Sequence, residues 1–106
     1  MIEDILEEMK NEGYRSAVIQ KDGTLFKSNF QFEEPTPSIV ASMLNVSDAL
    51  LKQAEGNGKE YELALEDGSI LVGIPINDYY LVSILEDREK KKIIREYASK
   101  MKDELK

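Results

Sequence analysis

Between Tyr14 and Leu85 the chain alternates short strand-like runs with tight turns, and one long apolar helix interrupts the pattern. Tyr14–Gln20 and Thr24–Asn29 have the composition of strands, and Gly23 between them can adopt the positive φ that a tight turn needs. Strands joined by so short a turn pair antiparallel, because a parallel crossover needs a dozen residues or more. The pattern therefore predicts an antiparallel sheet whose strands come in two groups.

Three further strands are expected after the helix. Lys59–Glu66 alternates apolar and acidic side chains, whereas Ser69–Ile74 and Tyr79–Leu85 are apolar on both faces. Turn-forming Asp, Gly and Asn residues separate these runs, and Pro75 is expected to end the middle one. Because strands that are apolar on both faces lie where a sheet is covered on both sides, helices should cover both faces of this sheet.

Three helices are available to do so. The first carries an apolar stripe at helical spacing and ends near Gly13, the second covers about Pro37–Glu55, and the third covers about Arg88–Leu105. The order helix, two strands, helix, three strands, helix predicts an α/β fold, a three-layer α/β/α sandwich with two helices on one face and one on the other. We expect one domain over residues 1–106.

Composition restricts the function more than it defines it. The chain has 106 residues, a net charge of −7, no Cys and no His. Without His it lacks the commonest general base and metal ligand, and an acidic surface repels phosphate backbones. No apolar run reaches the ~18 residues of a membrane span. We expect a cytoplasmic protein that binds neither nucleic acid nor a cofactor, does not insert into membranes, and is not an enzyme.

The charged clusters can be interpreted in two ways. Asp4, Glu7, Glu8 and Glu12 on the first helix have the residue types of a metal or acid–base site, but a solvated helix face has the same pattern. The run Lys90–Lys92 could meet an anionic surface or belong to an ordinary charged helix. The solvated interpretation is favoured for both clusters. Tyr80 could anchor a partner, although core packing is the more usual role.

The second helix carries more apolar surface than one sheet needs. Its apolar side chains fill roughly 160° of the helical wheel, against the ~100° stripe of an ordinary surface helix. Either loops cover the surplus, or one flank packs on a second copy of the chain. The second interpretation predicts a homodimer, supported by pairing of Lys59–Glu66 at a sheet edge. The expected dimer-interface residues are Val40, Met43, Leu44, Ser47, Leu51, Tyr61 and Leu63.

Three segments together resemble the roadblock/dynein light chain domain. They are the hairpin SAVIQKDGTLFKS, the helix PSIVASMLNVSDALLKQAEGNG and the closing strands EYELALEDGSILVGIPINDYYLVSIL. Their order and spacing match the family over nearly the whole chain. The loop that contains Pro35 and Pro37 and the highly charged last helix depart from the family pattern.

The resemblance implies a sheet order of 2-1-5-4-3 and a prokaryotic homodimer in which the central helices and the third strands of two copies meet. It also implies a non-enzymatic platform that binds and regulates a Ras-like small GTPase, or acts as an adaptor. The alternative is a small-molecule or peptide sensor of PAS-like or profilin-like shape, which would need an internal pocket. Central strands filled with Ile, Leu and Val favour the GTPase-binding module.

Overall fold

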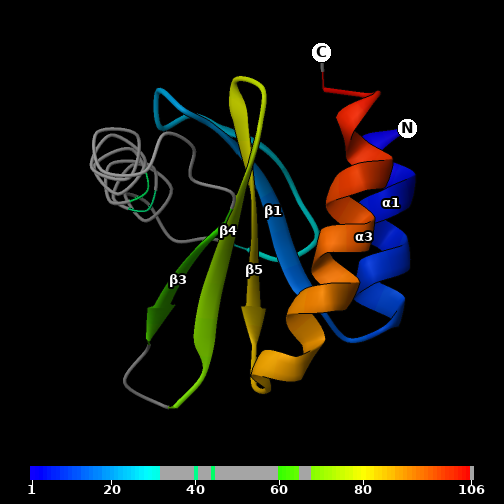
Figure 1. The fold of residues 1–106 in the computed structure, drawn as a ribbon. Coiled ribbons are helices and arrows are strands. Elements are labelled where there is room, and N and C mark those ends of the chain that lie inside the picture. The colour runs from blue at the N-terminus through cyan, green and yellow to red at the C-terminus, as the bar shows by residue number, and fades with distance from the viewer. Residues whose placement is uncertain (32–39, 41–43, 45–59, 65–67, 106) are drawn as a thin grey trace.

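The computed structural model describes residues 1–31, 40, 44, 60–64 and 68–105. Its centre is a five-stranded antiparallel sheet with the order β2-β1-β5-β4-β3, which confirms the order that the resemblance implied (Figure 1). The strands are β1 (Arg15–Gln20), β2 (Leu25–Ser28), β3 (Tyr61–Ala64), β4 (Ile70–Ile76) and β5 (Tyr79–Leu85).

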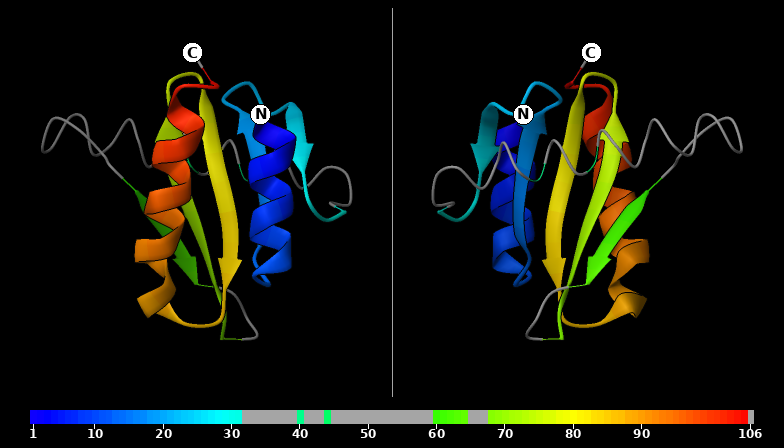
Figure 2. Two further views of the ribbon diagram at one scale, coloured as in Figure 1. Left: turned by 90° about the vertical axis from the view of Figure 1, so that its right-hand side faces the viewer. Right: turned by 90° about the vertical axis from the view of Figure 1, so that its left-hand side faces the viewer.

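Two helices, α1 (Ile2–Asn11) and α3 (Lys91–Lys102), lie side by side on one face of the sheet (Figure 2). The short 3₁₀ helix η1 (Arg88–Lys90) leads into α3. On the opposite face Val40 and Leu44 are helical and pack against the sheet. Helical residues therefore cover both faces, and the three-layer α/β/α arrangement is confirmed.

The core on the α1 and α3 face follows from the alternation of side chains along the strands. Val18, Val72 and Leu81 point from the three central strands toward the helices, where Leu6 and Ile94 meet them. This is the core cluster that the apolar stripes of the first and last helices predicted. Ser16 and Ser83 face the same side and, being paired in register, share a buried hydrogen bond of 2.7 Å between their hydroxyl oxygens.

The core on the opposite face is smaller and includes the helical residues Val40 and Leu44. They pack with a set of sheet residues that alternate with those of the first core, namely Ala17, Ile19, Tyr61, Leu71, Tyr80 and Val82. Tyr80 is fully buried, which confirms the core role preferred for it over that of a partner anchor.

The strand ends agree with the sequence in most places. β5 has the predicted bounds, and Gly13 and Gly23 have the positive φ expected of them, 91° and 99°. Pro75 is a correction, because it lies inside β4 and pairs with Tyr80 of β5 rather than ending the strand. Proline is tolerated there because the described pairing of β4 with β3 stops at Gly73.

Candidate functional site at the edge strand

Strand β3 forms one edge of the sheet and pairs only with β4 among the described strands. Its side chains alternate as the sequence predicted. Tyr61 and Leu63 lie on the side of Leu44, whereas Glu60 and Glu62 meet residues of η1 and α3. One face of this strand is thus apolar and the other is acidic.

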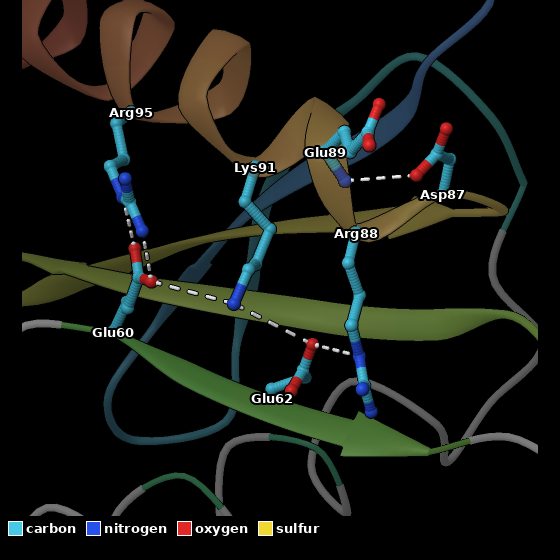
Figure 3. Close-up of polar contacts among 7 residues, drawn as sticks. All are labelled: Glu60, Glu62, Asp87, Arg88, Glu89, Lys91 and Arg95. Atoms are coloured by element: carbon cyan, nitrogen blue, oxygen red, sulfur yellow. Dashed lines mark hydrogen bonds and ion pairs between the residues drawn. The ribbon is translucent and has the colours of Figure 1, made fainter.

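A group of ion pairs ties the acidic side of β3 to the last helices (Figure 3). Arg95 donates from Nε and Nη2 to the two carboxylate oxygens of Glu60, at 2.6 Å and 2.7 Å. The ammonium group of Lys91 lies between the two acids, 3.8 Å from Glu60 and 3.7 Å from Glu62. Arg88 Nε lies 3.0 Å from the Glu62 carboxylate. We call these five residues the β3 clamp.

The clamp is a charge-assisted network on a partly exposed surface. The bidentate hydrogen bonds from Arg95 hold the pKa of Glu60 below its ordinary value, against a smaller opposing effect of partial burial. Hydrogen bonding to Glu60 likewise raises the pKa of Arg95. At the start of η1 the Asp87 carboxylate accepts a hydrogen bond of 2.9 Å from the backbone N–H of Glu89 (Figure 3). The cap and the clamp together fix where the last helices lie relative to β3.

Sequence reasoning did not find the clamp, although its signal is present. Arg88, Lys91 and Arg95 recur at spacings of three and four, which places them on one flank of a helix. Glu60 and Glu62 are two apart and share one face of a strand. Only the sheet order brings that flank and that face together, so the pairing needed the tertiary structure.

The predicted dimer-interface residues fall into three groups. Val40, Leu44 and Tyr61 are buried within the chain itself, with exposed fractions of 6%, 0% and 6%. Leu63 is half-buried at the rim of the same core. Met43, Ser47 and Leu51 lie outside the described residues, and so does most of the predicted helix Pro37–Glu55.

The close contact between Leu44 and Gly73 bears on the expectation of a filled core. A methyl group added at Gly73 would lie 2.8 Å from one Leu44 methyl carbon and 2.9 Å from the other. The side chain of Leu44 thus occupies the space that the glycine leaves open. Two hollows among the described residues, of about 520 Å³ and about 280 Å³, are lined by other residues.

The remaining charged candidates lie on the surface. Asp4, Glu7, Glu8 and Glu12 are exposed, and Glu8 forms an ion pair of 3.7 Å with Lys100. Within the described part of the chain no three acidic side chains gather as a metal site would require. Of the Lys90–Lys92 run, the middle residue belongs to the clamp and the other two are exposed. None of the described helices is long and apolar enough to cross a membrane.

Comparison with solved structures defines the fold of this chain. No family model matches the sequence, and no curated protein does. Solved structures do match. A structure described as MglB with a tetrameric arrangement has a TM-score of 0.75 and 19% identity, with 94% of this chain and 84% of that chain covered. A roadblock/LC7 domain from Streptomyces avermitilis has a TM-score of 0.72 and 8% identity, with 95% and 94% covered.

A more distant match is profilin II of Acanthamoeba castellanii, with a TM-score of 0.52 and 13% identity, covering 85% of each chain. The chain thus has the roadblock/LC7 fold, in the wider class of profilin-like sandwiches, and the resemblance drawn from its three sequence segments is confirmed at the level of the fold. Its structural neighbours include MglB and a roadblock domain, both more similar in fold than profilin.

Proposed function

We propose that this protein is a single-domain, homodimeric, non-enzymatic module that binds and regulates a Ras-like small GTPase. The observation that carries the proposal is the roadblock fold with an edge strand, β3, that pairs only with β4 among the described strands. The resemblance of the sequence to roadblock domains supplies the class of partner. The description of one similar structure, MglB with a tetrameric arrangement, supports the expectation of assembly.

The proposed dimer joins β3 to the β3 strand of a second copy. An unpaired edge exposes a row of N–H and C=O groups, and a two-fold axis lets two identical antiparallel edges satisfy each other. The β3 clamp supports this role because it holds β3 from the α3 side and leaves the strand's outer edge open. Tyr61 and Leu63 then lie beneath the line where the two second helices would meet.

The second helix of each copy would supply the apolar part of the interface. On a regular helical wheel Leu51 and Ser47 fall within roughly 60° of Val40 and Leu44. Because Val40 and Leu44 pack on the chain's own sheet, a regular helix through them would turn this side inward. Four other apolar residues lie roughly 60° to 120° from Val40 around the wheel, all on one flank. They are Ile39, Met43, Val46 and Leu50.

The flank of Met43 is therefore the one that we propose meets the second copy. Within the predicted set, Met43 and Leu63 would touch the partner, whereas Val40, Leu44, Ser47, Leu51 and Tyr61 would hold the helix and sheet in place beneath the contact. Burial of each large side chain at the contact contributes about 1.5–3 kcal/mol.

The effect on the GTPase would be positional, since the described surface gathers no catalytic group. A dimer presents two copies of one surface and can favour one arrangement of the GTPase switch regions over another. The net charge of −7 favours a partner with a basic patch and speeds their encounter. Complex formation should accordingly weaken as the Debye length shrinks to ~3 Å at high salt.

Two measurements test the proposal separately. Light scattering at micromolar concentration should give twice the 12.1 kDa of one chain, and a mass of one chain would end the dimer proposal. Titration of the source organism's small GTPases, each loaded with GDP or with a GTP analogue, should give binding that prefers one nucleotide. An unrelated nucleotide-binding protein of similar charge serves as the control.

The sensor alternative has less support. A sensor needs a cavity inside the domain, and Leu44 fills the space over Gly73 where the sheet has its smallest residue. The profilin-like shape is common to both readings and does not separate them. Binding of a small molecule inside the core, seen as protection of Val82 or Leu71 amides on ligand addition, would restore that alternative.

A further inference from the structure

A hollow of about 520 Å³ lies between the end of β4 and the flank of α3. Ile74, Pro75 and Ile76 line it from β4, and Arg95, Ser99 and Lys102 line it from α3. Its volume falls in the ~300–1,000 Å³ range of ligand sites in proteins. It combines an apolar wall with two cationic groups.

The charge of this hollow is opposite to that of the chain. The chain has 21 acidic and 14 basic residues, yet the residues that line the hollow include Arg95 and Lys102 and no carboxylate. Lys102 makes no ion pair with any residue that the structure describes, whereas Lys100, two positions earlier, is paired with Glu8. Glu60 neutralises Arg95 from just outside this lining, so the uncompensated positive charge at the hollow is that of Lys102.

Arg95 is held in place and is still able to bind a second anion. Glu60 accepts from its Nε and Nη2, which are two of the five N–H donors of a guanidinium group. The others remain free to bind a carboxylate from the side of the hollow. Glu60 therefore acts as a positioning residue that fixes the direction of Arg95.

The other polar groups of the hollow are already committed. Asn77 donates from Nδ2 to the backbone carbonyl of Leu105 at 2.9 Å, and the Ser99 hydroxyl donates to the backbone carbonyl of Arg95 at 3.2 Å. The charged donors left for a ligand are those of Arg95 and Lys102. A ligand that fits this pattern has an apolar part and supplies negatively charged acceptors.

We propose that this hollow is a docking site for a short segment of a partner protein in which apolar residues alternate with one or two carboxylates. The apolar side chains would lie on Pro75 and Ile76, and Arg95 and Lys102 would hold the carboxylates. A long acidic tract does not fit, because the net charge of −7 would repel it. The site goes beyond GTPase binding and gives the dimer a second kind of partner.

The experiment is an NMR titration of the isotope-labelled protein alone. The probe is an acetylated and amidated pentapeptide in which three leucines alternate with two glutamates. We expect saturable shifts of the Arg95 side-chain Nε–Hε signal and of the amides of Ile76 and Ser99. Lys102→Gln should weaken binding about threefold to fivefold, as loss of one exposed charge contact does. Lys100→Gln is the matched control and should leave binding unchanged.

Three results would overturn the proposal. The first is a failure of the site itself, seen either as no saturable shifts at the hollow or as equal weakening of peptide binding by Lys100→Gln and Lys102→Gln. The second is equal binding of the peptide in which both glutamates are replaced by glutamine, which would remove the role of the two cations. The third is that acetate, or vesicles of anionic phospholipid, shift the same signals as strongly as the peptide, which would make the hollow a simple anion or lipid site. Since no GTPase is present, the outcome is independent of the proposed regulatory function.

Discussion

Replacing Gly73 with Ala tests how tightly the helix that carries Leu44 packs on the sheet. Gly73 lies in β4 between Tyr61 and Val82 of the neighbouring strands, with the two methyl carbons of Leu44 over it. A new Cβ would lie 2.8 Å and 2.9 Å from those carbons, inside van der Waals contact, and Leu44 is fully buried. Both contacts are with the methyl end of one side chain, so the cost depends on how far the buried Leu44 can shift.

The free energy of unfolding should fall by up to about 2.5 kcal/mol in Gly73→Ala. Overpacking of a filled core costs about 1–3 kcal/mol, while replacing glycine by alanine within a strand returns about 0.5–1 kcal/mol. Leu44→Ala alone should cost about 2–5 kcal/mol, since it removes a buried leucine and leaves a cavity. In the Leu44→Ala background the clash is gone, so Gly73→Ala should become neutral or stabilising.

The assay is equilibrium denaturation of the four proteins of this double-mutant cycle, all at one protein concentration because a dimer's stability depends on it. The reasoning predicts a coupling free energy of about 1–3 kcal/mol, with a change in the sign of the Gly73→Ala effect. Additive effects of the two substitutions within ~0.5 kcal/mol would refute the contact between Leu44 and Gly73.

Three further predictions concern the surface. Arg95 lowers the pKa of Glu60 below its ordinary value of 4.5, so the pair stabilises the fold above that pH. The contribution is lost as pH falls through the lowered pKa. Glu60→Gln should therefore flatten the acidic limb of the plot of stability against pH, whereas Glu96→Gln should not. Met43→Glu should halve the mass measured by light scattering and leave the circular dichroism spectrum unchanged. Leu51→Glu should unfold the chain because it buries an unpaired charge. If Leu51→Glu instead gave a folded monomer and Met43→Glu unfolded the chain, the other flank would be the one that meets the partner. No stoichiometric metal should survive dialysis, and a retained metal would contradict the non-enzymatic proposal.

Much of the fold could be predicted because local and global signals agree. Gly13 and Gly23 mark the end of a helix and a turn, and the apolar runs on either side of them have the period of the elements they form. The bounds of Tyr79–Leu85 were predicted because polar turns flank a continuous apolar run. Pro75 was placed wrongly because proline is excluded from a strand only where the position must donate a backbone N–H. That need depends on how far the neighbouring strand extends.

The surface features were less accessible to sequence reasoning. The alternation of Tyr61 and Leu63 with Glu60 and Glu62 predicted two faces of β3, but not that α3 would supply the cations for the acidic one. The wheel of the second helix could not by itself say which flank faces inward. The packing of Val40 and Leu44 on the sheet is the described contact from which we infer that direction.

The central claim is that this roadblock-fold protein recognises a Ras-like small GTPase. The most direct test is calorimetric titration of the wild-type protein with each small GTPase of its organism, loaded in turn with GDP and with a GTP analogue. The account predicts that at least one GTPase binds, that the affinity differs between the two nucleotide states, and that it falls as salt is raised. Failure of every GTPase to bind in either state, with a protein shown to be folded and dimeric, would contradict it.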